Sequence, residues 1–361
     1  MAHTEPVPKK LILVIGATGA QGLAVIDSLL APCGDGSPSP YAVRALTRDP
    51  LGRRAQELKS KGVEVVQGAF DDCPSMYAAL RGVYGAFVNT DGFTVGEEKE
   101  TWAGIRLFEI AKEVGTVRHY VYSGLDYVLK KGNYDPKYHF GHTDAKARVA
   151  DFMRAQPSAV SDAAMSWSVV STCPYMDMLY THMFGPLKKR DDGTFVFATP
   201  VGAGQVPMIA LSDIGFFARY TFDHRAETSA QELEVASDVV GWEYLAETFR
   251  RVTGQKAEVV YLSYEEWCEL LDGVDRPIAN ERQAGDGSTT WRENFAAWWS
   301  TWRDGVVTRD MDWIRKVNPG GHTLETFMRE KGYTGELNRG LLKNSEDGKS
   351  ITPRWSKISQ L

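Results

Sequence analysis

Three glycines, Gly16, Gly19 and Gly22, recur at intervals of three directly after the apolar run Leu11–Ile15. The run is typical of a buried strand, and Ala20–Leu30 behind it has the apolar spacing of a helix. In this setting Gly16 allows a tight turn, Gly19 lets the backbone approach a pyrophosphate, and Gly22 lets helix and strand pack closely. The N–H groups and positive dipole end of the helix would then face phosphates, so we predict a dinucleotide-binding turn. A tight turn without a ligand is the alternative. The turn residues are Gly16, Thr18, Gly19, Ala20, Gln21 and Gly22.

The end of the second predicted strand, Tyr41–Thr47, indicates which dinucleotide would bind. Proteins that prefer NAD place an acidic residue here for the ribose 2′-hydroxyl. This chain instead offers Arg44, Thr47 and Arg48, which could hold a 2′-phosphate through charge-assisted hydrogen bonds. We therefore predict NADP(H) as the cofactor, with solvated surface arginines as the alternative.

Further polar residues follow later predicted strands. Asp71 and Asp72 come after the third strand, where a side chain could contact the adenine or simply cap a helix. Asn89–Phe93 follows the fourth strand and Cys173–Met176 the sixth. The carboxyl ends of parallel strands meet at one edge of a sheet, where such folds bind ligands. Ordinary loop structure is the alternative. The cofactor-site candidates from these segments are Asp71, Asn89, Thr90, Pro174 and Tyr175.

The order of the predicted elements positions these residues. Up to residue 174, short apolar strands alternate with helices, which requires a parallel sheet covered on both faces. The chain then changes to short strands and an aromatic helix, Trp291–Trp302, whose rings share one face and fit a core, a subunit contact or the roof of an aromatic ligand. The fold class is α/β, a Rossmann-type doubly wound parallel sheet with a smaller α+β C-terminal lobe. The strands are predicted at Leu11–Ile15, Tyr41–Thr47, Val63–Gln67, Gly85–Asn89, His119–Ser123 and Ser166–Thr172.

These patterns divide the 361 residues into four parts. Residues 1–10 form a flexible N-terminus, and residues 11–174 form an NADP-binding Rossmann domain to whose sheet later strands return. Residues 175–337 form the substrate lobe. Residues 338–361 are polar, and we expect a loosely held tail there.

Composition excludes several classes of protein. With 41 Lys+Arg and 47 Asp+Glu the net charge is −6, which argues against a broad nucleic-acid-binding face. No apolar run approaches the roughly 18 residues of a membrane span, and no signal-peptide stretch precedes Leu11. The four cysteines form no C-x-x-C pair. We expect a cytoplasmic protein, monomer or homodimer, that binds neither membrane nor nucleic acid.

The segments Gly16–Gly22 and Val43–Pro50 resemble the NmrA-like family, which belongs to the atypical short-chain dehydrogenase/reductases and is related to isoflavone-reductase-type enzymes. The resemblance continues through Val121–Ser123, the pair His142-x-x-x-Lys146 and Ser212–Gly215, and covers roughly residues 10–260. It implies an N-terminal Rossmann domain, a smaller lobe and a ligand cleft between them.

The wider superfamily uses a Tyr-x-x-x-Lys pair with a Ser on the preceding strand, and the resemblance assigns catalytic positions accordingly. Ser123 and Lys146 match, whereas His142 stands at the Tyr position, so standard carbonyl reduction is in doubt. Residues four apart share a helical face, so Lys146 could bind the nicotinamide ribose and keep His142 neutral as a proton relay. Tyr138 is a substitute acid. A packing histidine and a surface lysine are the alternatives.

The resemblance implies two functions. The first is an NADPH-dependent reductase for a small aromatic or conjugated molecule, and the second is a non-catalytic NADP(H)-sensing regulator that acts through a protein partner. A non-redox enzyme that uses the same cleft is a weaker alternative. His139 and His142 lie three positions apart, with Asp144 close by, and could be considered for a metal ion. No third strong ligand lies at a diagnostic spacing, so we expect no metal site.

Overall fold

The computed structural model describes residues 8–337, 340, 342 and 346–361, so residues 1–7 of the predicted flexible N-terminus lie outside the described part. The core is a seven-stranded sheet in which every pairing is parallel. In order across the sheet, the strands are β10 (Gln231–Glu234), β6 (Ser166–Thr172), β5 (His119–Leu125), β4 (Gly85–Val88), β1 (Lys10–Ile15), β2 (Tyr41–Thr47) and β3 (Glu64–Gln67).

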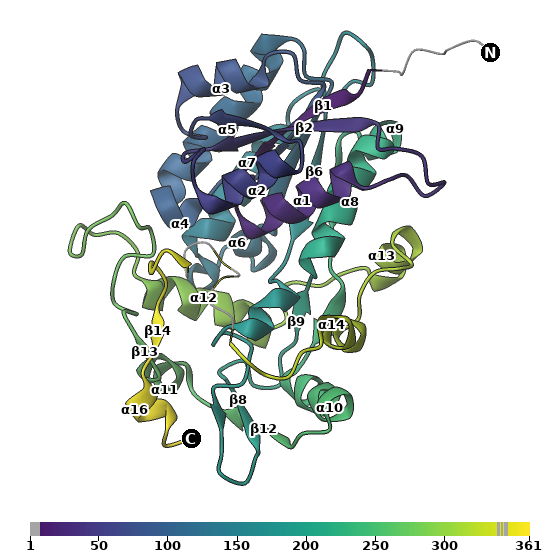
Figure 1. The fold of residues 1–361 in the computed structure, drawn as a ribbon. Coiled ribbons are helices and arrows are strands. Elements are labelled where there is room, and N and C mark those ends of the chain that lie inside the picture. Colours follow the sequence, from purple (N-terminus) through teal and green to yellow (C-terminus); the bar gives the residue numbers. More distant parts are fainter. Residues whose placement is uncertain (1–7, 338–339, 341, 343–345) are drawn as a thin grey trace.

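Helices cover both faces of this sheet (Figure 1). The main ones are α1 (Ala20–Leu30), α2 (Arg53–Ser60), α3 (Cys73–Leu80), α5 (Glu97–Val114), α7 (Gly141–Arg154) and α8 (Leu211–Asp223). Successive side chains of a strand point to opposite faces. Along β1, Ile12 and Val14 accordingly pack with α1 and α8, while Leu13 and Ile15 pack with α3, α5 and α7. The predicted doubly wound fold is confirmed.

The chain returns to the sheet after the predicted boundary at residue 174. Helix α8 packs on α1 so closely that a Cβ on Gly215 would lie 2.5 Å from the carbonyl oxygen of Ala24. Strand β10 then adds an edge to the sheet, beside β6. Residues 211–234 therefore pack with the sheet, whereas most of the remaining chain after 174 forms the lobe.

The lobe combines three small sheets with helices, as the α+β prediction required. Its sheets pair β12 (Ala257–Tyr261), β8 (Phe195–Thr199) and β7 (Lys188–Lys189); β11 (Asp238–Val240) and β9 (Val206–Met208); and β13 (Leu271–Asp272) and β14 (Thr352–Pro353). Its helices are α10 (Trp242–Thr253), α11 (Tyr264–Glu269), α12 (Trp291–Arg303), α14 (Leu324–Lys331) and α16 (Trp355–Ile358). Helix α13 (Met311–Val317) instead packs with α8 in the core of the large sheet. Further short elements are α4 (Gly92–Val95), α6 (Val128–Lys131), α9 (Arg225–Thr228), η1 (Pro136–Tyr138) and η2 (Met176–Tyr180).

Helix α12 lies between the large sheet and the sheets of the lobe (Figure 1). Its aromatic side chains are at most 7% exposed and belong to the lobe core, so the stripe Trp291–Trp302 is a packing feature. Capping by Thr290, whose side chain accepts from the Glu293 N–H, fixes where α12 begins.

The predicted polar tail is partly held. Residues 338–339, 341 and 343–345 lie outside the described part, but Ile351 and Ile358 are 5% and 1% exposed in the lobe core. Strand β14 pairs with β13. The expectation of a loosely held tail is therefore wrong for residues 346–361, because two isoleucines anchor an otherwise polar stretch.

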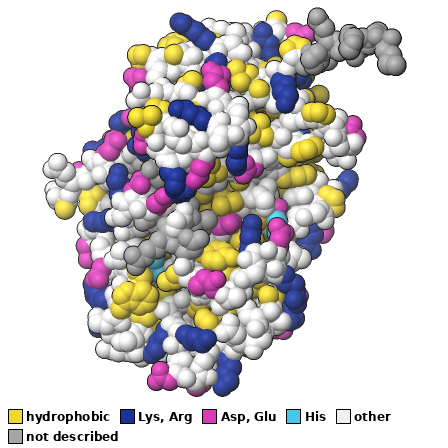
Figure 2. Space-filling model, in the orientation of Figure 1, with side chains coloured by type: hydrophobic (Ala, Val, Ile, Leu, Met, Phe, Trp, Pro, Cys, Tyr) yellow, Lys and Arg dark blue, Asp and Glu magenta, His cyan; other side chains and the backbone are white. Residues whose placement is uncertain are grey.

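The outer surface shows no single dominant charge on the face drawn in Figure 2, where Lys and Arg side chains are interspersed with Asp and Glu side chains. Among the described residues, no helix combines the length and the apolar character that crossing a membrane requires.

Candidate functional site

The glycine turn between β1 and α1 is shaped by close backbone contacts. Gly16 has a φ of 77°, and a Cβ there would lie 2.8 Å from the carbonyl oxygen of Asn89. A Cβ on Gly22 would lie 2.2 Å from the carbonyl oxygen of Gly16. Side chains are excluded at both positions, so the tight turn and the close helix–strand packing have the geometric basis that the sequence predicted.

The N-terminus of α1 is open to an anion. Its N-cap is Gly19, which supplies no capping side chain, and the first turn contains no acidic residue. The first helical hydrogen bond runs from the N–H of Leu23 to the carbonyl oxygen of Gly19. The N–H groups of Ala20, Gln21 and Gly22 precede it and have no helical acceptor. This cradle fits the phosphates of a dinucleotide.

Thr47 and Arg48 lie at the carboxyl end of β2, as predicted. The Thr47 hydroxyl accepts a hydrogen bond from the N–H of Asp49 at 3.2 Å. Arg48 is exposed, and no other described residue pairs with its guanidinium. Its charge is therefore available to a phosphate at this edge of the sheet.

Arg44 does not join this group. Its guanidinium donates to the carbonyl oxygens of Ala79 and Arg81 at 2.8 and 2.9 Å, and it lies 3.0 Å from Glu64. These partners are the end of α3 and the start of β3, at the edge of the sheet opposite the end of β2. The expectation that Arg44 holds a 2′-phosphate is wrong, because its side chain satisfies the last carbonyl groups of α3 instead.

Two arginines that the sequence analysis did not assign lie beside the turn. Arg54 of α2 donates from Nη1 to the carbonyl oxygen of Thr18 at 2.9 Å, and its side chain is 9% exposed. Arg53 precedes it in the first turn of the helix. The sequence offered one signal for these two arginines, which is their position in the first turn of a helix. The positive end of the helix dipole lies there and disfavours cations.

Lys146 connects the ends of two neighbouring strands. Its Nζ donates to Asn89 Oδ1 at 3.0 Å and to the Thr90 carbonyl oxygen at 2.9 Å after β4. A longer bond of 3.4 Å reaches the carbonyl oxygen of Ser123 in β5. Lys146 is only 8% exposed, which excludes the surface-lysine alternative. Asn89, Thr90 and Lys146 therefore form one cluster.

A buried carboxylate, Glu100 of α5, completes this cluster. The sequence analysis did not identify it as a site residue. Its Oε1 lies 3.3 Å from Lys146 Nζ and accepts from the Thr90 hydroxyl at 2.7 Å. Glu100 is fully buried, and this burial raises its pKa although the Lys146 ammonium opposes the shift. The sequence places Glu100 in an ordinary charged helix, so no local signal reveals its partner 46 positions away.

Gln21 ties the glycine turn to the strand ends. Its Nε2 donates to the Tyr175 hydroxyl at 2.8 Å, and its Oε1 accepts from the Ser123 hydroxyl at 2.7 Å. Burial raises the pKa of Tyr175 to about 12, so its phenol stays neutral at pH 7. Ser123 and Tyr175 thus meet near the turn, while Pro174 pairs through its carbonyl oxygen with the N–H of Ile209.

His142 sits in α7 with Lys146, since this helix begins at Gly141. Asn294 of α12 donates from Nδ2 to His142 Nδ1 at 3.1 Å, which leaves the ring proton on Nε2. The ring centroid lies 4.6 Å from that of Phe93 and 6.0 Å from that of Phe295. Burial lowers the pKa of His142 to about 4, and the Lys146 ammonium adds to the effect. The imidazole is therefore neutral near pH 7, as predicted.

Tyr138 faces the lobe. Its hydroxyl donates to Asp304 Oδ2 at 3.0 Å, and its ring lies over Gly132, where a Cβ would be 2.2 Å away. The partners of Lys146 do not include it. The geometry therefore supports a contact between η1 and the lobe and gives no support to the predicted role as a substitute acid.

The two aspartates after β3 have separate partners. Asp72 caps α3 by accepting from the Ser75 N–H at 3.1 Å, which confirms the helix-cap alternative. Asp71 lies 2.7 Å from Lys99 of α5. Its contact with an adenine stays a prediction.

Glu97, His139 and Asp144 are close enough together to be considered for a metal ion. However, His139 Nδ1 lies 2.6 Å from Asp144, while its other nitrogen, Nε2, lies 3.6 Å from Glu97. One imidazole presents a single nitrogen to one ion, and here Nδ1 is hydrogen-bonded to Asp144 while Nε2 makes only a longer contact with Glu97, so the two nitrogens face different carboxylates. Arg148 also pairs with Glu97.

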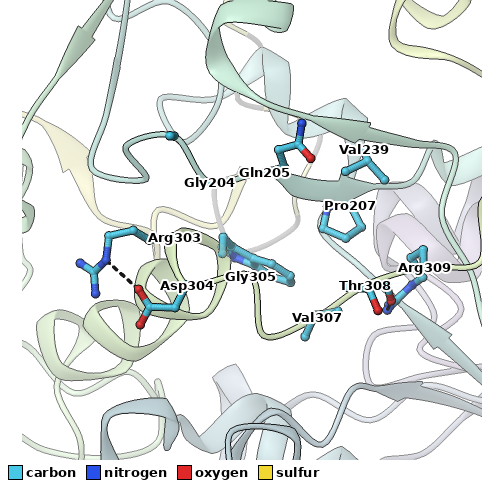
Figure 3. Close-up of a pocket in the computed structure, with 12 residues that line it drawn as sticks. Gly204, Gln205, Pro207, Val239, Arg303, Asp304, Gly305, Val307, Thr308 and Arg309 are labelled. Carbon is cyan, nitrogen blue, oxygen red and sulfur yellow. Dashed lines mark hydrogen bonds and ion pairs between the residues drawn. The ribbon is translucent and has the colours of Figure 1, made fainter.

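A hollow of about 460 Å³ lies in the lobe, beside the loop that follows α12 (Figure 3). Asp304 lines it and also accepts from Tyr138. Arg309 lines it as well, and binds Asp126 just after β5 at 2.7 Å. All lining residues lie between 203 and 309. The lining includes neither a residue of the glycine turn nor Lys146, Asn89, Thr90 or Glu100.

The parallel sheet and the open, glycine-lined start of α1 define a Rossmann-type protein with a candidate phosphate-binding turn. A model of the NmrA-like family matches residues 8–284, and the chain belongs to this family.

Curated relatives of this family match most of the chain. It is 26% identical over 342 residues to "NmrA-like family domain-containing oxidoreductase malD" of Malbranchea aurantiaca, covering 85% of this chain and 96% of that protein. It is 30% identical over 281 residues to "NmrA-like family domain-containing oxidoreductase notA" of Aspergillus sp. (strain MF297-2), covering 72% and 77%.

Solved structures share the fold at lower identity. NmrA, a negative transcriptional regulator crystallised in complex with NADP, matches with a TM-score of 0.67 at 21% identity, over 90% of this chain and 95% of that one. The NADPH-dependent quinone oxidoreductase QOR2 of Escherichia coli, complexed with NADPH, matches with a TM-score of 0.64 at 18% identity, over 89% and 100%.

Proposed function

We propose that this chain binds NADP(H) and reduces a small aromatic or conjugated molecule. The observation that carries the proposal is the glycine cradle at the uncapped start of α1, together with Arg48 at the neighbouring strand end, whose guanidinium has no partner among the described residues. The names of the curated relatives as oxidoreductases, and the NADP and NADPH in two similar structures, support it.

Each part of the proposed cofactor site would bind a different part of the dinucleotide. The N–H groups of Ala20 to Gly22 would hold the pyrophosphate, and Arg48 with Thr47 would hold the 2′-phosphate. Lys146, fixed by Asn89 and Thr90, would bind the nicotinamide ribose. Pro174 and Tyr175, which follow β6, would border the nicotinamide.

Bound NADPH would supply a hydride, and the chain's own residues would orient and polarise the acceptor. The hydroxyl of Ser123 donates to Gln21 and that of Tyr138 to Asp304, so neither is free as an acid. His142 is neutral at pH 7, with a pKa of about 4, and can donate only a hydrogen bond from Nε2. We therefore propose that Lys146 and His142 polarise the hydride acceptor, and that water supplies the proton that the reduced product takes up.

The surroundings of His142 favour the proposed substrate class. Phe93 and Phe295 flank its ring at centroid distances of 4.6 and 6.0 Å, and Phe140 lies at 5.2 Å. Phe140 and Phe295 are packed in the lobe core, whereas Phe93 is half-buried, so Phe93 is the ring that a conjugated or aromatic acceptor would meet.

A second candidate is a regulator that binds NADP(H) without turning it over. It is favoured by the engagement of Ser123 and Tyr138, whose hydroxyls already donate to Gln21 and Asp304. One similar structure is titled a negative transcriptional regulator.

One experiment separates these candidates. NADPH binding is measured by calorimetry, and NADPH oxidation is followed by absorbance with a panel of quinones, enones and imines. Binding with turnover that is lost in Lys146→Met supports the reductase. Binding without any turnover supports the regulator, and absence of binding contradicts both.

A further inference from the structure

The chain crosses from the lobe to the sheet near its C-terminus. On one side of the crossing, Tyr333 is 1% exposed and donates to the carbonyl oxygen of Leu179 at 2.9 Å. On the other side, Ile351 is 5% exposed in the lobe core. Between these two anchors, Gly340 and Glu346 contact α2, which covers the large sheet (Figure 1).

The Glu346 carboxylate binds two guanidinium groups at once. Its Oε1 lies 2.8 Å from Arg53 Nη2, and its Oε2 lies 2.8 Å from Arg54 Nη2. The carbonyl oxygen of Gly340 accepts from Arg54 at 2.8 Å. The hydrogen bond from Arg53 is the largest of the effects that lower the pKa of Glu346, so this carboxylate is ionised at pH 7. An anion therefore occupies the arginine pair.

The arginine pair lies at the phosphate end of the proposed cofactor site. Arg54 touches the glycine turn through the carbonyl oxygen of Thr18, and α2 directly follows the strand that ends in Thr47 and Arg48. In a Rossmann fold the ribose 2′ position lies between that turn and the end of the second strand. Paired guanidinium groups hold carboxylate and phosphate with the same fork geometry.

We propose that Glu346 competes with the 2′-phosphate of NADP(H) for Arg54. Binding of the phosphorylated dinucleotide displaces the carboxylate into solvent, whereas NAD(H), which carries a hydroxyl at this position, leaves it in place. Glu346 thus lowers the affinity of the arginine pair for the phosphorylated cofactor. This inference rests on the proposed function.

The test compares Glu346→Gln with the matched control Glu57→Gln. Glu57 is also 2.7 Å from Arg53, but it lies in α2 itself and is not among the ion-pair partners of Arg54. Dissociation constants for NADPH and NADH are measured by calorimetry. We expect Glu346→Gln to bind NADPH about threefold more tightly, the scale of one partly exposed ion pair, and to leave NADH affinity unchanged. Glu57→Gln should leave the ratio of the two constants unchanged.

Several results would overturn the inference. Weaker NADPH binding in Glu346→Gln would mean that the crossing holds the cofactor. Equal tightening for both nucleotides, or the same tightening in Glu57→Gln, would mean a general charge effect. An unchanged Glu346→Gln would remove the competition while the proposed function stands. A wild-type protein that binds neither nucleotide would refute the proposed function itself.

Hydrogen exchange supplies a second readout on the wild-type protein. NADPH should increase exchange in the peptide 346–350, while NADH should not. Protection of this peptide by NADPH would contradict displacement.

Discussion

The glycine turn and the Lys146 cluster lie at the same edge of the sheet but are built differently. In the turn, Gly22 must be glycine because of Gly16, six residues earlier, and the geometry comes from backbone contacts. In the cluster, Lys146 is hydrogen-bonded to Asn89, which is 57 positions away in the sequence. Beside the cluster, in the same helix, His142 is hydrogen-bonded to Asn294, which is 152 positions away. The turn is thus specified mainly by local sequence, whereas the cluster exists only once the whole sheet and lobe have folded.

The energetics differ as well. The turn depends on space, because a Cβ added to Gly16 or Gly22 would collide with backbone. The cluster depends on charge, because Lys146 and Glu100 are both buried and each offsets the other. Removing one member of such a pair costs more than the pair itself contributes.

The largest effect should come from Gly22→Ala. Its Cβ would lie 2.2 Å from the carbonyl oxygen of Gly16, so α1 must shift away from β1. We expect a loss of about 3 kcal/mol in unfolding free energy, measured by urea denaturation. Nucleotide affinity should fall by about tenfold or more, measured by calorimetry.

The matched control for this prediction is Gly34→Ala. Gly34 has no atom within 4 Å of an added Cβ and lies in the loop before β2. If both variants lost affinity equally, the turn would not be defined by space.

The next effect tests charge in the cluster. Lys146→Met leaves Glu100 buried without a cation, and we expect a loss of about 3 kcal/mol in unfolding free energy at pH 7. The double variant Lys146→Met/Glu100→Gln should recover most of this stability but not the turnover. A double variant as unstable as the single one would show that the pair does not act as a charge pair.

The third prediction concerns pH. Burial lowers the pKa of His142 from 6.5 to about 4, so between these values the unfolded chain binds a proton that the folded chain does not. The contribution of His142 to stability is present above pH 6.5 and is lost as the pH falls toward 4. At pH 5 it should be about 2 kcal/mol smaller than at pH 7.

Urea unfolding of His142→Phe at both pH values checks this prediction, since the variant should lose that part of the pH dependence. Identical slopes in wild type and His142→Phe would mean that the imidazole is not buried in its neutral form.

The smallest effect is expected for Tyr138→Phe. It removes one hydrogen bond to Asp304 and should lower the unfolding free energy by about 1 kcal/mol. Turnover should stay within about twofold of wild type, as expected for a contact outside the Lys146 cluster. A large loss of turnover at unchanged stability would restore Tyr138 as a catalytic candidate.

The difference between the glycine turn and the Lys146 cluster also explains which parts of the site could be predicted from the sequence. The strand, the three glycines and the helix behind them follow local steric rules, so the turn and the first helix were found at the residues where they lie. The spacing of His142 and Lys146 was equally local, and α7 carries both.

The remaining site residues depend on tertiary contacts that no local pattern encodes. Arg44 lies in the correct strand, but its side chain reaches α3 at the opposite edge. Glu100 belongs to a helix that reads as an ordinary charged surface, and only the fold brings it to Lys146. Arg54 lies in α2, whose sequence is polar, and only the fold brings its guanidinium to the carbonyl oxygen of Thr18.

The most direct test of the central claim compares NADPH and NADH binding in the wild type, Arg48→Ala and Arg44→Ala by calorimetry. We predict that the wild type prefers NADPH, and that Arg48→Ala reduces this preference by about tenfold, the scale of one charge-assisted contact with a phosphate. Arg44→Ala should keep the preference, because its guanidinium binds the end of α3. A wild type that binds NADH as tightly as NADPH, or that binds neither, would contradict the account.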